Sequence, residues 1–192
     1  MLVSARDGTS TGALDLDTAA EKMSTDNLFK LLRASDTMED ATIVSEILKE
    51  LWKAHVDSEL RWRLDTAIGH MLSGNTELAL SLFGELVEED PQYAEAWNKA
   101  STCEFMMGNM DGALAAAQKT LELIPNHYQA LNGLGLIHYE NKELSSAISC
   151  FQSSMQIDPW SPVSSRLAAC QDTLDARRGG AIKGSDQEWK AP

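Results

Sequence analysis

One pattern recurs in ALSLFGELVEEDP (Ala79–Pro91), ALAAAQKTLELIP (Ala113–Pro125) and AISCFQSSMQIDP (Ala147–Pro159). Each segment begins with alanine and ends with proline, and each begins 34 residues after the one before it. Phe83 and Phe151 also match at twice this period, with a smaller residue between them. A period of roughly 20–50 residues is typical of proteins in which similar units stack side by side. The sequence therefore predicts three stacked units.

Apolar residues within each period recur at intervals of three and four, which is the spacing of one face of an amphipathic helix. No stretch alternates apolar and polar residues for long enough to predict a strand. Short polar segments, GNTE (74–77), GNMD (108–111) and NKEL (141–144), divide each unit into two helices. The proline after each second helix marks its end, because proline has no N–H to donate and disfavours helical backbone before it. The expected fold is all-α, with three helix-turn-helix units.

These features resemble the tetratricopeptide repeat family. The resemblance covers residues from about Ser58 to Pro159 as three units, at 60–93, 94–127 and 128–161. It implies a right-handed α-solenoid, and it assigns structural roles to residues at the positions that the family favours. These are Ala79, Phe83, Pro91, Trp97, Ala113, Pro125, Leu134, Gly135, Ala147, Phe151 and Pro159.

The stretch LNGLGLIHYE contains Gly133 and Gly135, and this G-x-G pair raises the alternative of a phosphate-binding loop. A dinucleotide-binding loop has a third glycine three residues after the second, where this sequence has His138. One and two periods before Gly135 the sequence has Ser101 and Ala67, which are also small. We therefore interpret Gly135 as a residue that lets the two helices of a unit approach closely.

The segments on either side of the repeats are expected to extend the helical stack. Residues 24–57 carry a broad apolar stripe and are predicted to form a helical hairpin that covers the N-terminal end of the stack. Residues 162–178 are predicted to form a C-terminal capping helix, because the ends of a repeat stack need a polar outer face. Residues 1–23 and 179–192 are rich in Gly, Ser, Thr, Asp and Lys and are predicted to be disordered tails.

The hairpin and the repeats together are similar to small tetratricopeptide repeat proteins of alphaproteobacteria and to their plant and algal relatives. The similarity lies in NLFKLLRAS (27–35), EILKELW (46–52), AEAWNK (94–99) and GLGL (133–136). In that family the bacterial members tend to be exported and the plant members tend to enter organelles. Because this sequence has no readable targeting segment, we expect a soluble intracellular protein, cytoplasmic by default. A mature or truncated chain would be compatible with an organelle stroma or matrix.

The composition disfavours several classes of partner and site. The chain has 16 Lys and Arg against 29 Asp and Glu, a formal net charge of −13, which disfavours nucleic acid because basic residues supply the affinity for phosphates. No window approaches the roughly 20 apolar residues of a membrane-spanning helix, so we expect no membrane insertion. The cysteines show no metal-binding spacing and are expected to be small buried residues in a reducing compartment. They are Cys103, Cys150 and Cys170.

No pattern in the sequence indicates catalysis. The G-x-S-x-G motif of serine hydrolases and the H-E-x-x-H motif of zinc peptidases are absent, and we expect no cofactor and no metal site. His70 and His138 lie two periods apart and are interpreted as structural. His55 and His127 fall at a helix end and in a turn between units. We therefore expect a protein that is not an enzyme.

The first helix of each unit lines the concave side of such a stack, which is the expected partner-binding groove. Asn98 and Asn132 lie one period apart, and their amides could both donate to and accept from the main chain of an extended peptide. The alternative is that residues on this side contact the N-terminal hairpin or are only solvated. The predicted groove residues are Arg61, Leu64, Ile68, Met71, Glu95, Asn98, Thr102, Phe105, Met106, Gln129, Asn132, Leu136 and Tyr139.

One subtype of the family binds acidic chaperone tails through a clamp of lysine, asparagine and arginine side chains on the concave helices. Only one of the matching positions in this sequence supplies a positive charge, so we expect this clamp to be absent. The residues at those positions are Leu64, Ile68, Lys99, Gln129 and Gly133.

Two functional hypotheses follow from the repeat pattern. The first is a non-enzymatic scaffold, an adaptor or assembly factor, that binds a peptide or helix of a protein partner in the concave groove. The alternative is a structural subunit held permanently in a larger complex through its convex face or its ends, around Trp52, Trp62 and Trp160. Sequence alone does not choose between them, because a repeat scaffold hosts many unrelated binding tasks.

Overall fold

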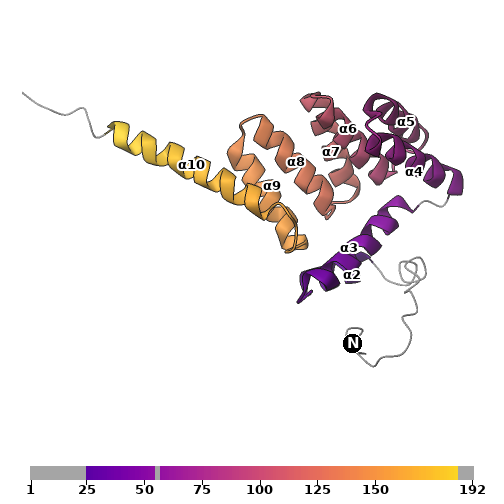
Figure 1. Cartoon of the computed structure of the whole chain (residues 1–192), viewed down its shortest axis with the longest axis horizontal. Helices are drawn as coiled ribbons and strands as arrows, with labels where there is room; N and C mark the ends of the chain where they lie inside the picture. The colour runs from indigo at the N-terminus through magenta and orange to yellow at the C-terminus, as the bar shows by residue number, and fades with distance from the viewer. Residues whose placement is uncertain (1–24, 55–56, 186–192) are drawn as a thin grey trace, which may run out of the picture.

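All regular secondary structure in the described part of the chain, residues 25–54 and 57–185, is α-helical in the computed structural model. This confirms the all-α prediction. Figure 1 shows the helices arranged as successive antiparallel pairs along one stack. They are α2 (Thr25–Arg33), α3 (Met38–Lys53), α4 (Ser58–Leu72), α5 (Thr76–Glu89), α6 (Ala94–Met106), α7 (Met110–Leu123), α8 (Tyr128–Glu140), α9 (Leu144–Ile157) and α10 (Ser164–Ser185).

Three helix pairs, α4–α5, α6–α7 and α8–α9, form the body of the molecule and confirm the predicted solenoid of three units. Adjacent pairs also touch, because α5 packs on α6 and α7 packs on α8. In the first unit, Phe83 of α5 is fully buried in a cluster with Leu64 and Ala67 of α4. In the third unit, Phe151 of α9 is fully buried as well. Burial of apolar side chains at repeated positions is therefore what holds the stack together.

The turns inside the three units share one backbone geometry. Gly74, Gly108 and Lys142 lie one period apart, and their φ angles are 82°, 80° and 64°. A positive φ of this size is the left-handed region, which glycine enters without steric cost and which residues with a Cβ avoid. Two units thus have glycine where the turn requires it, and the third holds Lys142 in the same conformation.

Gly135 lies where α8 and α9 press together, in agreement with the interpretation of the G-x-G pair. The residue is buried, and a Cβ built on it would overlap the ring of Phe151. Gly133, by contrast, has open space at its Cβ position. Both glycines lie within α8, so the pair belongs to helix packing and not to a phosphate-binding loop.

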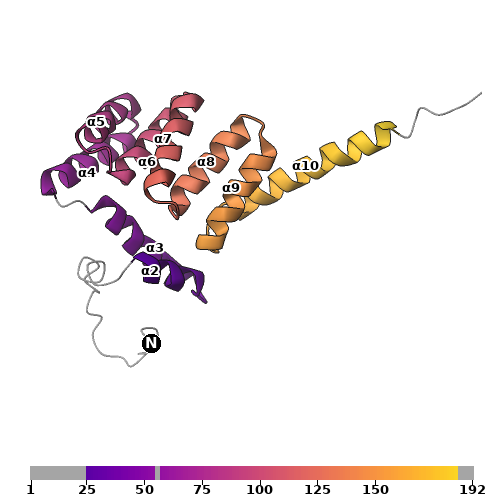
Figure 2. The same cartoon turned by 180° about the vertical axis from the view of Figure 1, so that it is seen from behind.

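Helices α2 and α3 form a hairpin whose position differs from the predicted one. Figures 1 and 2 show it running along one edge of the stack, where the prediction has it covering the N-terminal end. Leu28, Leu48 and Trp52 on its apolar face form one cluster with Tyr128 of α8 and Ile157 of α9. The physical reason for the difference is that the apolar side chains completing this face belong to the third unit and not to the first.

At the other end of the stack, α10 packs on α9 through Cys170, together with Val163 directly before the helix, in the cluster that contains Phe151. The helix runs to Ser185 and so extends beyond the predicted limit at 178. Residues 179–185, which their composition assigns to a tail, continue the helix because glycine weakens a helix but, unlike proline, keeps the N–H that helical hydrogen bonds need. The predicted tails at 1–23 and 186–192 lie outside the described residues.

Candidate functional site

The predicted groove residues differ in how much of each side chain reaches solvent. Some are exposed, others are half-buried, and a third set is covered by the rest of the chain. The exposed residues are Thr102, Met106 (56%) and Tyr139 (39%), the buried ones are Leu64, Glu95 and Asn98, and the half-buried ones are Arg61, Ile68, Met71, Phe105, Gln129, Asn132 and Leu136.

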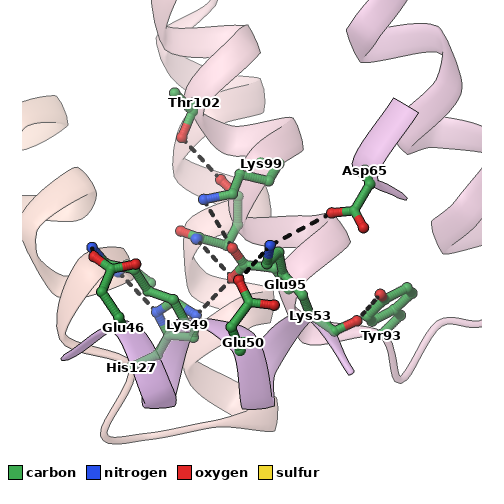
Figure 3. Close-up of polar contacts among 12 residues, drawn as sticks. Glu46, Lys49, Glu50, Lys53, Asp65, Tyr93, Glu95, Lys99, Thr102 and His127 are labelled. Atoms are coloured by element: carbon green, nitrogen blue, oxygen red, sulfur yellow. Dashed lines mark hydrogen bonds and ion pairs between the residues drawn. The ribbon is translucent and has the colours of Figure 1, made fainter. Parts of the chain in front are cut away.

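Helix α3 lies against α4 and α6, and its contacts account for part of this difference. Glu50 of α3 pairs with Arg61 of α4, with 3.3 Å between Oε2 and Nη2, and Lys53 pairs with Asp65, with 3.6 Å between Nζ and Oδ1. The hydroxyl of Tyr93, directly before α6, donates a hydrogen bond to the carbonyl oxygen of Lys53. Figure 3 shows the side chains of Glu50 and Lys53 from α3, Asp65 from α4 and Tyr93 from the start of α6 lying close together. The N-terminal hairpin therefore occupies one side of the predicted groove.

Glu95 of α6 is a buried carboxylate at the centre of these contacts (Figure 3). It accepts hydrogen bonds from Lys99 Nζ at 2.8 Å and from Asn98 Nδ2 at 3.0 Å. A third hydrogen bond, of 3.0 Å, joins it to His127 Nε2. Burial alone would raise the pKa of the Glu95 carboxyl, but the hydrogen bond from His127 and the charge of Lys99 outweigh burial and lower the pKa to about 2. The carboxylate is thus ionised at neutral pH and fully engaged within the fold.

His127 connects the hairpin to the second and third units. Its Nδ1 accepts a hydrogen bond from the Ala130 N–H at 3.2 Å, so it caps the N-terminus of α8 and leaves Nε2–H to donate to Glu95. The Trp52 ring stacks on the His127 ring, with 3.8 Å between centroids and 20° between planes. The sequence interpretation gave His127 only a turn position. Its position directly before the first helix of the third predicted unit is the sequence feature that indicates a capping role.

The amides of Asn98 and Asn132 do not form the repeated pair that their spacing suggests. The Asn98 amide donates to Glu95, whereas Asn132 Nδ2 donates to the Ser161 hydroxyl oxygen at 3.1 Å. Within the described residues, Asn132 Oδ1 and Gln129 Oε1 are buried without a hydrogen-bond partner. The third unit therefore keeps unused acceptors at positions where the second unit has a satisfied network.

The other polar candidates do not gather into a reactive cluster within the residues that the structure describes. No group of three or more His, Cys, Asp or Glu side chains is placed there to hold a metal ion. His138 Nδ1 pairs with Glu143 at 2.6 Å beside a turn, and His55 lies outside the described residues. Cys103 and Cys170 are buried and Cys150 is half-buried, all as free thiols. Among the described helices, none combines the length and the apolar character needed to span a membrane.

Comparisons with known sequences identify the repeat. Two family models, both described as tetratricopeptide repeat, match residues 70–134 and residues 107–162. A tetratricopeptide repeat-containing protein of Rhizobium etli is 24% identical over 119 residues, which are 62% of this chain and 58% of the relative. This chain thus spans about three fifths of that relative's length. The match agrees with the resemblance to repeat proteins of alphaproteobacteria.

Solved structures share the fold of this chain. The first tetratricopeptide repeat domain of Spaghetti (RPAP3), bound to the HSP90 peptide SRMEEVD, has a TM-score of 0.60 at 15% identity and covers 63% of this chain and 98% of its own. The type III secretion chaperone SycD of Yersinia enterocolitica, in complex with a peptide of the translocator YopD, has a TM-score of 0.58 at 17% identity, covering 65% and 99%. With the sequence period and the stacked helix pairs, the two family models identify residues 70–162 as tetratricopeptide repeats, and the solved structures share their fold.

Proposed function

We propose that this chain is a non-enzymatic adaptor or assembly factor that binds a peptide or helix of a protein partner in its concave groove. The observation that carries the proposal is the open part of the groove, defined by Thr102, Met106 and Tyr139, whose side chains reach solvent. Methionine and tyrosine suit such a surface, because the first adapts its shape to apolar partners and the second combines an apolar ring with a polar tip. The peptides held by RPAP3 and SycD support the same use of the fold in this chain.

We infer that the bound peptide is not an acidic tail. At the clamp positions Leu64 and Ile68 supply no charge, and the ammonium group of Lys99 is already paired with Glu95 at 2.8 Å. The formal net charge of −13 also repels an acidic peptide during approach. A neutral or basic segment of a partner fits this surface better.

Affinity capture from a cell extract, followed by mass spectrometry, tests the groove. The test variant of the full chain carries Met106→Glu and Tyr139→Glu, two changes at exposed positions. The matched control carries Leu78→Glu at an exposed position of α5. We expect partners that the wild type and the control retain to be lost from the double variant. If all three chains are folded by circular dichroism and retain the same partners, the interface lies elsewhere.

Trp62 favours a second function, that of a structural subunit attached to a larger complex through the first end of the stack. The side chain keeps 66% of its surface accessible on α4, because none of the described helices covers it. The other two tryptophans considered for this role are engaged: Trp52 is buried, and Trp160 Nε1 donates to the Ser35 carbonyl oxygen at 3.1 Å. Partners lost from a Trp62→Glu variant but retained by the groove variant would favour this second function.

A further inference from the structure

We propose that the surface under the α2–α3 hairpin is a docking site for an amphipathic helix of a protein partner. The hairpin covers this site in the free protein, and the partner helix displaces it. The partner helix carries an aromatic residue next to a lysine or arginine. This inference rests on the proposed function and deepens it, because it names the partner chemistry and the regulation of the same groove.

The hairpin is seated on the stack as a helical ligand would be. Leu48 and Trp52 lie one turn apart on α3, are buried, and face the cluster that Tyr128 and Ile157 supply from the third unit. The Trp52 ring stacks on the His127 ring. Recognition of an amphipathic helix through apolar anchors spaced by one turn is a common mode of binding in grooves. The surface therefore already has the shape and the apolar character that such a helix requires.

The charges around α3 define the polar side of the recognised helix. Lys49 and Lys53 lie one turn apart, next to the two apolar anchors in the sequence. Lys53 Nζ approaches Asp65 of α4 at 3.6 Å, whereas Lys49 Nζ pairs with Glu46 of its own helix at 2.6 Å. One acidic group of the stack is thus placed to receive a basic group of a helix. The net charge of −13 further favours the approach of a basic segment.

The polar contacts between the hairpin and the stack are incomplete, which favours exchange. The ion pairs to Arg61 and Asp65 are partly exposed to solvent, and such pairs add little to stability. Trp52 Nε1 on the hairpin is buried without a hydrogen-bond partner in the described part of the chain. A buried polar group without a partner costs free energy. A partner helix whose aromatic residue has no unpaired donor could therefore compete with the hairpin even though the hairpin is tethered.

A peptide with the sequence of residues 25–54, carrying a fluorescent label, is the probe for this exchange. Its binding to two full-length chains is measured by anisotropy: the wild type, and a variant with about 20 Gly and Ser residues inserted between α3 and α4. The insertion changes no contact of the hairpin or of the groove. Because the effective concentration of a tethered ligand falls roughly as the −3/2 power of tether length, we expect the peptide to bind the insertion variant about 15-fold more tightly than the wild type.

A second peptide, with Trp52→Ala and Lys53→Glu, is the matched control and should bind neither chain. The proposal is overturned if the unmodified peptide binds neither chain, both being folded by circular dichroism, or if both peptides bind equally well. Such a failure leaves the proposed function standing, because Met106 and Tyr139 are tested separately by capture. Conversely, if the labelled peptide binds as expected but affinity capture finds no partner, the proposed function is refuted and the displacement of the hairpin is not.

Discussion

The repeat units and the N-terminal hairpin are held in place by different kinds of contact. In the units, Phe83 and Phe151 are fully buried against helices of their own and neighbouring units, at positions that the 34-residue period fixes. The hairpin adds to its apolar cluster two partly exposed ion pairs and the stack of Trp52 on His127. The repeat period therefore encodes how the units pack on one another, whereas the docking of a flanking segment depends on side chains that occur only once.

The largest effect is expected from breaking a unit core. Phe151→Ala removes a fully buried ring and should lower the free energy of unfolding by about 3–5 kcal/mol. Leu78→Ala, at an exposed position of α5, is the control and should stay within about 0.5 kcal/mol of the wild type. Denaturant unfolding followed by circular dichroism measures both. Equal midpoints for the two variants would show that the repeated cores do not carry the stability of the stack.

Removal of the buried carboxylate should have the next largest effect. Glu95→Ala leaves Lys99 and Asn98 without their acceptor and His127 without its hydrogen-bond partner, and breaking a buried pair costs about 3 kcal/mol. Glu95→Gln keeps the shape of the side chain and loses its charge. The free energy lost by this variant therefore measures the electrostatic part of the loss caused by Glu95→Ala. Denaturant unfolding at neutral pH measures both variants, and a loss below about 0.5 kcal/mol for Glu95→Ala would contradict the network.

The pH dependence of this effect follows from the lowered pKa of Glu95. The carboxyl has a pKa of about 2 in the fold against an ordinary value of 4.5, so its contribution is fully present above the higher value. The contribution is lost as the pH falls through the folded pKa. The difference in unfolding free energy between wild type and Glu95→Gln should therefore shrink from pH 5 toward pH 2. A difference that stays constant over this range would rule out the lowered pKa.

A smaller loss is expected from crowding the contact between α8 and α9. Gly135→Ala places a methyl group against the Phe151 ring, and overpacking of this kind costs about 1–3 kcal/mol. Gly133→Ala is the control on the same helix, since open space surrounds its Cβ position and alanine is the better helix former. Thermal unfolding should thus separate the two variants in opposite directions. Similar melting temperatures would contradict the packing role of Gly135.

The smallest effect is a gain in the turn of the third unit. Lys142 has a φ of 64°, and glycine removes the steric cost of this conformation, so Lys142→Gly should stabilise the chain by about 1 kcal/mol. The converse change, Gly108→Ala, places a Cβ at a φ of 80° and should destabilise by a similar amount. Both are read from the midpoint of denaturant unfolding. A destabilised Lys142→Gly variant would mean that the lysine side chain contributes more than its backbone costs.

The parts of the fold that repeat could be predicted from sequence, and the parts that occur once could not. The prolines and the small residue at the position of Gly135 recur at one period, and the phenylalanines recur at twice that period, so their packing follows from the repeat pattern. The position of the hairpin depends on Trp52 meeting His127 and on Leu48 meeting Ile157, and these partners are about 75 to 109 residues apart with no period to connect them. Long-range contacts between unique residues leave no pattern in a single sequence.

The same limit applies to the candidate site. The repeat register indicated which positions line the concave side, but not that Glu95 and Asn98 would be buried by internal contacts. Their burial depends on His127, which caps the helix that directly follows it, and on the hairpin, which docks through contacts between residues far apart in the sequence. Exposure in the groove is therefore a property of the whole chain, and Met106 and Tyr139 are recognised as the exposed positions only from the structure.

Hydrogen exchange of the full chain in native conditions tests most directly whether the hairpin is a separate, displaceable part docked on a cooperative stack. We expect the amides of α2 and α3 to exchange together, with an opening free energy well below that of α6 to α9. Trp52→Ala should speed exchange in the hairpin alone, whereas Phe151→Ala should speed it in the stack. Equal protection of the hairpin and the stack, with both variants affecting both regions alike, would contradict the account, because the hairpin would then be an inseparable part of one cooperative fold.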